Sequence, residues 1–195
     1  ERPGNECRTR RLECSFGVRI SASHNSYHDN GIKFFDGTGS KLSDDLEDEI
    51  ECLLDRPVVT QESQHLGKAI RIDRSRTQYQ QFCASTIPPG MNLQGFKIVV
   101  DCANGAAYKV APAALWELGA EVIAINVEPD GFNINKECGS THPAGLQKKV
   151  HEVRADIGIA LDGDADRVVI VDETGAIVDG AKIMALIAES GHPSG

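Results

Sequence analysis

From residue 96 onward, short apolar runs alternate with segments of helical periodicity. Runs of strand length occupy residues 96–100, 122–125, 157–161 and 168–171, and the helical segments are 112–118, 143–153 and 181–189. Such alternation predicts a parallel sheet with helices on both faces. Ligands of such sheets bind at the carboxyl ends of the strands, so the residues that follow each run are the first candidates for a site.

The segment before residue 96 gives fewer signals of regular structure. Val18 and Ile20 indicate a short strand, and residues 32–35 read as a second strand after the Asn30-Gly31 turn. Ser43 is expected to cap a helix that carries an apolar stripe and ends before Pro57; the stripe consists of Leu46, Ile50, Leu53 and Leu54. Residues 67–85 are expected to form a second helix with a polar side.

Three carboxylates follow the apolar run 157–161 at i, i+2 and i+4, namely Asp162, Asp164 and Asp166. Like charges at this spacing repel one another unless a cation lies between them. Oxygen ligands of this kind suit a hard divalent ion, Mg²⁺ or Ca²⁺. A solvated acidic turn without a metal is the simplest alternative.

A calcium-binding EF-hand loop is a second alternative, because its pattern also matches at Glu173. Arg167, however, stands where that loop needs glycine for a sharp turn. The flanking segments also read as strands, whereas an EF-hand needs helices. These two departures disfavour the calcium loop.

A polar turn at residues 20–25 offers the hydroxyl of Ser23. A hydroxyl that can carry phosphate, together with a carboxylate metal site, suggests phosphoryl transfer. Taken singly, the signals are weak: Ser23 can simply bond to the local backbone, His24 can be structural, and Lys33 can be a surface charge.

Composition narrows the class of protein. The formal net charge of −9 over 195 residues disfavours a general nucleic-acid binder, which would normally show a basic face. None of the six cysteines forms a CxxC pair, so we expect reduced thiols in a cytoplasmic protein. No apolar run reaches the roughly 18 residues that a membrane span needs, so we expect no membrane partner.

Taken together, the motifs resemble the α-D-phosphohexomutases. The chain is most similar to a bacterial branch of that family that acts on phosphorylated hexosamines. Residues 21–25 with 29–33 resemble the family's phosphoserine loop, and residues 162–167 resemble its metal loop. The supporting segments are 99–105, 133–135 and 139–143.

The resemblance implies roles for particular side chains. Ser23 would carry a phosphoryl group, and Mg²⁺ would be held by a phosphate oxygen on Ser23 and by the three aspartates Asp162, Asp164 and Asp166. Lys33 and Arg167 would add positive charge near the phosphate, Lys33 is also a candidate for proton transfer, and His24 would position the loop. The implied substrate is a phosphorylated hexosamine.

The resemblance also implies an α/β fold with mixed or parallel sheets sandwiched by helices. Residues 1–66 would be a partial phosphoserine-loop domain, and residues 67–195 a near-complete metal-binding α/β domain. The family's last two domains, which hold the sugar and its second phosphate, have no counterpart in this sequence, so we expect them as missing C-terminal domains of the same chain.

The sequence departs from the family at a few points. Ser26 stands where proline is usual, Ala165 where glycine is frequent, and Arg19 in a normally apolar strand. Residues 1–17 match poorly, and whether they are native to the family or are foreign or misread sequence stays open.

Two other classes of protein stay open. One is a metal-dependent phosphatase in which Asp162 is the nucleophile and Ser23 is dispensable. The other is a non-catalytic module that binds calcium or a partner protein. Within the family itself, a phosphomannomutase or phosphoglucomutase is the alternative.

Overall fold

The computed structural model describes residues 12–72 and 75–191, which fall into two compact units. The first contains the chain up to Ile20 and the segment Ile32–Tyr79; the second contains Ser21–Gly31 and the chain from Gln80 onward. The loop that carries Ser23 therefore belongs to the second unit, although the strands that flank it belong to the first. Each unit is described by itself.

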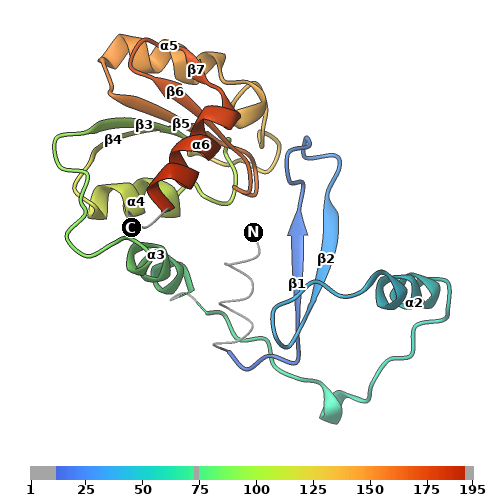
Figure 1. Cartoon of the computed structure of the whole chain (residues 1–195). Helices are drawn as coiled ribbons and strands as arrows, with labels where there is room; N and C mark the ends of the chain where they lie inside the picture. The colour runs from blue at the N-terminus through green and yellow to red at the C-terminus, as the bar shows by residue number, and fades with distance from the viewer. Residues whose placement is uncertain (1–11, 73–74, 192–195) are drawn as a thin grey trace. The chain divides into compact units, whose positions relative to one another are not determined.

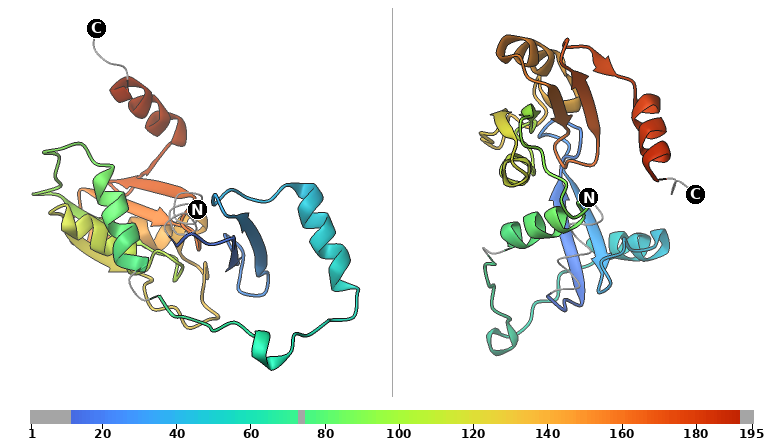
Figure 2. Two further views of the ribbon diagram at one scale, coloured as in Figure 1. Left: turned by 90° about the horizontal axis from the view of Figure 1, so that it is seen from below. Right: turned by 60° about the vertical axis from the view of Figure 1, so that its left-hand side comes forward.

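A five-stranded sheet forms the centre of the second unit (Figure 1, with two further views in Figure 2). Its strands are β3 (Lys97–Asp101), β4 (Glu121–Ile125), β5 (Ile157–Leu161), β6 (Val168–Asp172) and β7 (Ile177–Val178), in the order β4-β3-β5-β6-β7. Strand β3 runs parallel to β4 and β5, whereas β6 is antiparallel to both of its neighbours. The sheet is therefore mixed.

The mixed sheet confirms the expected α/β fold with mixed or parallel sheets, although strand–helix alternation by itself predicts parallel strands. Residues 162–167 are all that connect β5 to β6. A parallel neighbour needs a crossover of a dozen or more residues. Because this link is much shorter, β6 must run antiparallel to β5. This turn contains the three aspartates.

Helices cover both faces of the sheet. Helix α5 (Ala144–Val153) packs on β3, β5 and β6, and α4 (Val110–Glu117) packs against β4 on the opposite face (Figure 1). Right-handed crossovers that leave β3 and β4 in opposite directions along the sheet require this arrangement. Consistent with it, Ile98, Val99 and Val100 are all buried, although neighbouring residues of a strand point to opposite faces.

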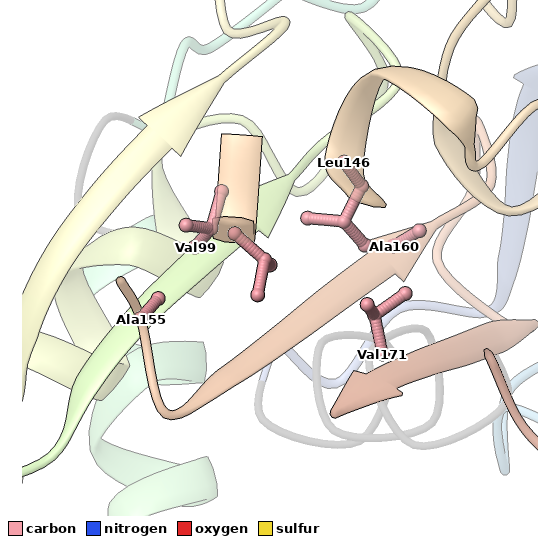
Figure 3. Close-up of a cluster of buried hydrophobic side chains, with 6 residues drawn as sticks. Val99, Leu146, Ala155, Ala160 and Val171 are labelled. Atoms are coloured by element: carbon pink, nitrogen blue, oxygen red, sulfur yellow. The ribbon is translucent and has the colours of Figure 1, made fainter. Parts of the chain in front are cut away.

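The core lies between α5 and the sheet (Figure 3). Val99, Ala160 and Val171 come from three adjacent strands, and Leu146 and Val150 come from α5. Fully burying a side chain such as Leu146 contributes about 1.5–3 kcal/mol. This packing fixes the carboxyl ends of β3 and β5, from which the candidate site is built.

Two further helices complete the second unit. Helix α6 (Gly180–Gly191) follows β7, and a short 3-10 helix, η2 (Gly139–Thr141), precedes α5. Helix α3 (Ser75–Ser85) spans the boundary between the units, and the Gln80 amide on its second-unit part donates to the Glu117 carboxylate at the end of α4 at 2.8 Å. No helix among residues 12–72 and 75–191 is both long and apolar enough to cross a membrane.

The first unit holds a two-stranded sheet of β1 (Phe16–Ser21) and β2 (Gly31–Asp36), followed by α2 (Asp44–Leu54) and the 3-10 turn η1 (Ser63–His65). The predicted cap of α2 is confirmed, since Ser43 Oγ accepts from the Leu46 amide.

The helix expected over residues 67–85 is too long, because the described helix begins at Ser75. Ile70 is 82% exposed, so the preceding segment buries no apolar face. Without such burial a short helix is marginal in water.

Candidate functional site

The turn between β5 and β6 closes on itself through bonds to Asp162. Oδ1 of the Asp162 carboxylate accepts from the backbone amides of Asp166 at 3.1 Å and Arg167 at 3.2 Å. The backbone carbonyl of Asp162 accepts from the Ala165 amide at 3.1 Å. Ala165 sits at φ 61°, in the left-handed region where a side chain costs about 1–2 kcal/mol. Glycine, which has no Cβ atom, would adopt this conformation without that cost.

The turn brings the three carboxylates together. Asp162, Asp164 and Asp166 each offer an oxygen within 4.8 Å of the others; the first two side chains are buried and the third is exposed. Within the described residues, Asp162 Oδ2 is buried without a hydrogen-bond partner. A buried, unpaired carboxylate oxygen beside two like charges is strongly unfavourable unless a cation neutralises it. An all-oxygen donor set fits Mg²⁺ or Ca²⁺.

The flanks of this turn decide against the EF-hand alternative. The turn is preceded by β5 and followed by β6, and these two strands pair with each other. An EF-hand loop lies between two helices. The expectation that strands flank the aspartates is confirmed.

The serine loop lies directly against the aspartate turn. Gly163 is buried, and a Cβ atom added to it would overlap the carbonyl oxygen of Ser23. Ser23 itself sits at φ 53°, and its amide donates to Ser21 Oγ at 3.0 Å. Sequence alone could not show this proximity, because 139 other residues separate Ser23 from Gly163 along the chain.

Asn135 is a residue of the site for which the sequence indicated no role. Its side-chain amide nitrogen donates to the carbonyls of Ser23 and Asn25, both at 2.8 Å. Residues 133–135 contributed to the family resemblance, but asparagines after a turn are common in loops. Only the tertiary contact distinguishes Asn135 from its neighbours.

Asp101 is a second residue that sequence reasoning missed. It is fully buried at the end of β3, and its two carboxylate oxygens accept from the amides of Ala103 and Gly139, each at 2.9 Å. It thereby fastens the end of β3 to η2. Two thiols lie near this carboxylate. Burial raises the pKa of Cys102 to about 12 and the pKa of Cys138 to about 11, and the negative charge of Asp101 contributes to both increases.

The remaining predicted residues are less closely grouped. His24 is exposed and lines a cavity of about 540 Å³, which Tyr27, Phe132 and His142 also border. The Arg167 side chain is exposed at the end of the aspartate turn. Lys33 lies on β2 in the first unit, so the second unit does not itself contain it.

Comparison with known families identifies both parts of the chain. A sequence model described as "Phosphoglucomutase/phosphomannomutase, alpha/beta/alpha domain II" matches residues 79–175, and the corresponding model of domain I matches residues 3–57. The match to domain I begins at residue 3, so the family model includes most of residues 1–17, whose origin the sequence alone left open.

Individual relatives agree with these matches. The chain is 69% identical to a phosphoglucosamine mutase of Mesorhizobium japonicum over 95% of its own length. A solved phosphoglucomutase/phosphomannomutase family protein of Burkholderia thailandensis is 28% identical over 90% of this chain and 37% of its own, with a TM-score of 0.70. The fold also resembles that of an Aspergillus fumigatus N-acetylphosphoglucosamine mutase solved with GlcNAc-6P and magnesium, at 22% identity over 93% of this chain and 48% of that one, with a TM-score of 0.57.

The chain spans only 42% of the length of the Mesorhizobium relative.

Proposed function

Because the chain belongs to the phosphoglucomutase/phosphomannomutase family, we propose that it carries the phosphoserine and metal loops of a phosphoglucosamine mutase. Such an enzyme interconverts glucosamine 6-phosphate and glucosamine 1-phosphate. The observation that carries the proposal is the direct contact between the Ser23 loop and Gly163 of the aspartate turn. The 69% identity to a phosphoglucosamine mutase supports the choice of sugar.

In this proposal Ser23 Oγ carries the transferred group. The phosphoserine gives its phosphoryl group to the free hydroxyl of the bound sugar phosphate, which produces a sugar bisphosphate and free Ser23. The bisphosphate turns over in the site, and Ser23 Oγ then accepts its other phosphoryl group. The sugar leaves as the isomeric monophosphate, and the serine is again phosphorylated, so no phosphate is consumed.

Asp162, Asp164 and Asp166 would hold Mg²⁺ with a phosphate oxygen on Ser23, and their clustered oxygens fit such an ion. When bound, Mg²⁺ would neutralise charge that develops on the phosphoryl group during transfer. Lys33 and Arg167 would add fixed positive charge, Lys33 is the candidate for moving the hydroxyl proton, and His24 would position the loop.

We propose further that residues 1–66 are a partial phosphoserine-loop domain and residues 67–195 a metal-binding domain. Additional domains of the whole protein would hold the sugar and its second phosphate. The 42% coverage of the Mesorhizobium relative supports this division of labour.

A chimera tests the function. The chain replaces the matching residues of the Mesorhizobium japonicum relative, and conversion of glucosamine 6-phosphate is measured with a sugar 1,6-bisphosphate primer. We expect turnover that Ser23→Ala nearly abolishes, while Ser26→Ala in the same loop retains most of it. Parallel assays with mannose 1-phosphate and glucose 1-phosphate test the choice of sugar.

Peptide mapping of the active chimera should locate phosphate on Ser23. Near-normal turnover of Ser23→Ala would contradict the mechanism. Phosphate on Asp162 would instead support the phosphatase alternative.

A further inference from the structure

Asn135 lies where three loops of the second unit meet. It lies in the loop between β4 and η2, and its backbone amide donates to the carbonyl of Ala103, just beyond the end of β3, at 2.9 Å. Its φ of 57° is left-handed, a conformation that asparagine tolerates better than most residues. The residue is only 7% exposed. The backbone of Asn135 is thus anchored to the sheet, and its side chain is held in a fixed direction.

The amide group of Asn135 is committed to the serine loop. Both of its partners, the carbonyls of Ser23 and Asn25, are acceptors, so only the NH₂ end can face them. Among the described residues, the Oδ1 end is buried without a partner. Leaving a buried acceptor unpaired is unfavourable. The contacts with the serine loop therefore determine how this side chain is oriented.

The same amide also touches the aspartate turn. A Cβ atom on Gly163 would lie 2.8 Å from Asn135 Nδ2, as well as against the Ser23 carbonyl. Asn135 thus contacts both loops whose alignment the proposed phosphoryl transfer needs. The serine loop also makes local bonds: the Ser23 amide donates to Ser21 Oγ, and the Asn25 amide donates to the Ala22 carbonyl.

We infer that Asn135 is a positioning residue, which holds Ser23 against the aspartate turn through its two hydrogen bonds to loop carbonyls. The inference rests on the proposed function. Orientation of the reacting groups supplies much of the rate in such reactions, so a small displacement of Ser23 is expected to slow transfer.

Asn135→Asp tests the inference with little change in shape. The substitution replaces the NH₂ group, which donates both hydrogen bonds, by a carboxylate oxygen that cannot donate to the two carbonyls. Aspartate also tolerates the left-handed φ of this position. Asn133→Asp is the matched control: the Asn133 amide donates to the Glu128 carbonyl in the neighbouring turn and does not bond the serine loop. Asn135→Ala, which adds no charge, serves as a second variant if Asn135→Asp does not fold.

The first measurement is amide hydrogen exchange on the 195-residue chain. Loss of two ordinary hydrogen bonds should raise the exchange rate of the Asn25 amide about 5- to 150-fold. The Ala165 amide in the aspartate turn should change little in the same variant, and Asn133→Asp should leave the Asn25 amide unchanged. Equal exchange at Asn25 in wild type and both Asn135 variants would overturn the inference.

The second measurement reports how close Ser23 lies to the metal site. A general loss of stability would not change that distance selectively. The chain is produced with phosphoserine at position 23, Mn²⁺ is added, and relaxation of the phosphorus nucleus is followed. We expect strong relaxation in wild type and in Asn133→Asp, and much weaker relaxation in Asn135→Asp at equal Mn²⁺ occupancy.

The two possible failures are distinguishable. Unchanged relaxation in the Asn135 variants would overturn the positioning role. No relaxation in wild type would count against the proposed function, and the exchange of the Asn25 amide would still decide whether Asn135 holds the loop.

Discussion

Asp101→Asn should destabilise the chain strongly although it changes no volume. The two carboxylate oxygens of Asp101 accept from the amides of Ala103 and Gly139. An asparagine keeps one acceptor, but its NH₂ group must then face the other backbone N–H. One hydrogen bond is lost, and a buried donor is left without an acceptor.

The size of the effect follows from burial. Asp101 is fully buried, so water cannot replace the lost acceptor. A hydrogen bond to a charged group contributes about 1.5–3 kcal/mol, and an unpaired buried donor costs about 1–3 kcal/mol. The neutral amide is easier to bury than a carboxylate, which offsets part of this loss. We therefore expect a decrease of about 2–4 kcal/mol in the free energy of unfolding, a large fraction of a typical domain's total.

Urea unfolding followed by far-ultraviolet circular dichroism measures this quantity. Asp156→Asn is the control, because that carboxylate also accepts a backbone amide, from Lys97 at 2.7 Å, but is exposed. Water can satisfy the groups left there, so we expect a loss below about 1 kcal/mol. If both variants lose the same stability, the argument from buried acceptors is wrong.

Three further predictions concern the metal, the isolated chain and the thiols. Asp162→Asn should weaken Mg²⁺ binding about tenfold or more, since ligand charge sets affinity, and should leave the metal-free stability unchanged or slightly higher; calorimetric titration checks this, and unchanged affinity would place the metal elsewhere. The isolated chain should fold at least over residues 87–190 and show little mutase activity, which limited proteolysis and the glucosamine 6-phosphate assay test; turnover matching an intact enzyme would refute it. At pH 8 a disulfide thiol reagent should modify exposed Cys52 readily but Cys102 and Cys138 slowly, because their pKa values of about 12 and 11 leave little thiolate and burial limits access; equal rates would contradict those values.

The strands of the second unit other than β7 were predictable because each is a short apolar run bounded by turn residues. The run 157–161 coincides with β5, and the run 168–171 lacks only Asp172 of β6. Their antiparallel pairing follows from the short link of residues 162–167, whereas strand–helix alternation alone predicts parallel neighbours. The short strand β7 was not predicted, since two apolar residues form no recognisable pattern.

The residues of the candidate site also differ in whether the sequence alone could predict them. The aspartate cluster was predictable because its three members are close in sequence, and spacing alone brings them together. Asn135 and Asp101 act through contacts with residues distant in sequence. A single polar residue in a loop carries no sequence pattern that predicts such contacts. The position of Ser23 beside Gly163 was implied only by the family resemblance, since it depends on how the sheet brings separate loops together.

The contact between Asn135 and Ser23 has a consequence for biosynthesis. The two residues are 112 positions apart, and the ribosome makes the serine first. At typical synthesis rates of 5–20 residues per second, roughly 6–20 s pass between the synthesis of Ser23 and that of Asn135. During that interval the loop lacks its anchor, and the aspartates that would share the phosphate are also untranslated. We therefore expect a nascent chain to begin with an unloaded serine, which acquires its first phosphate only after the later strands have folded.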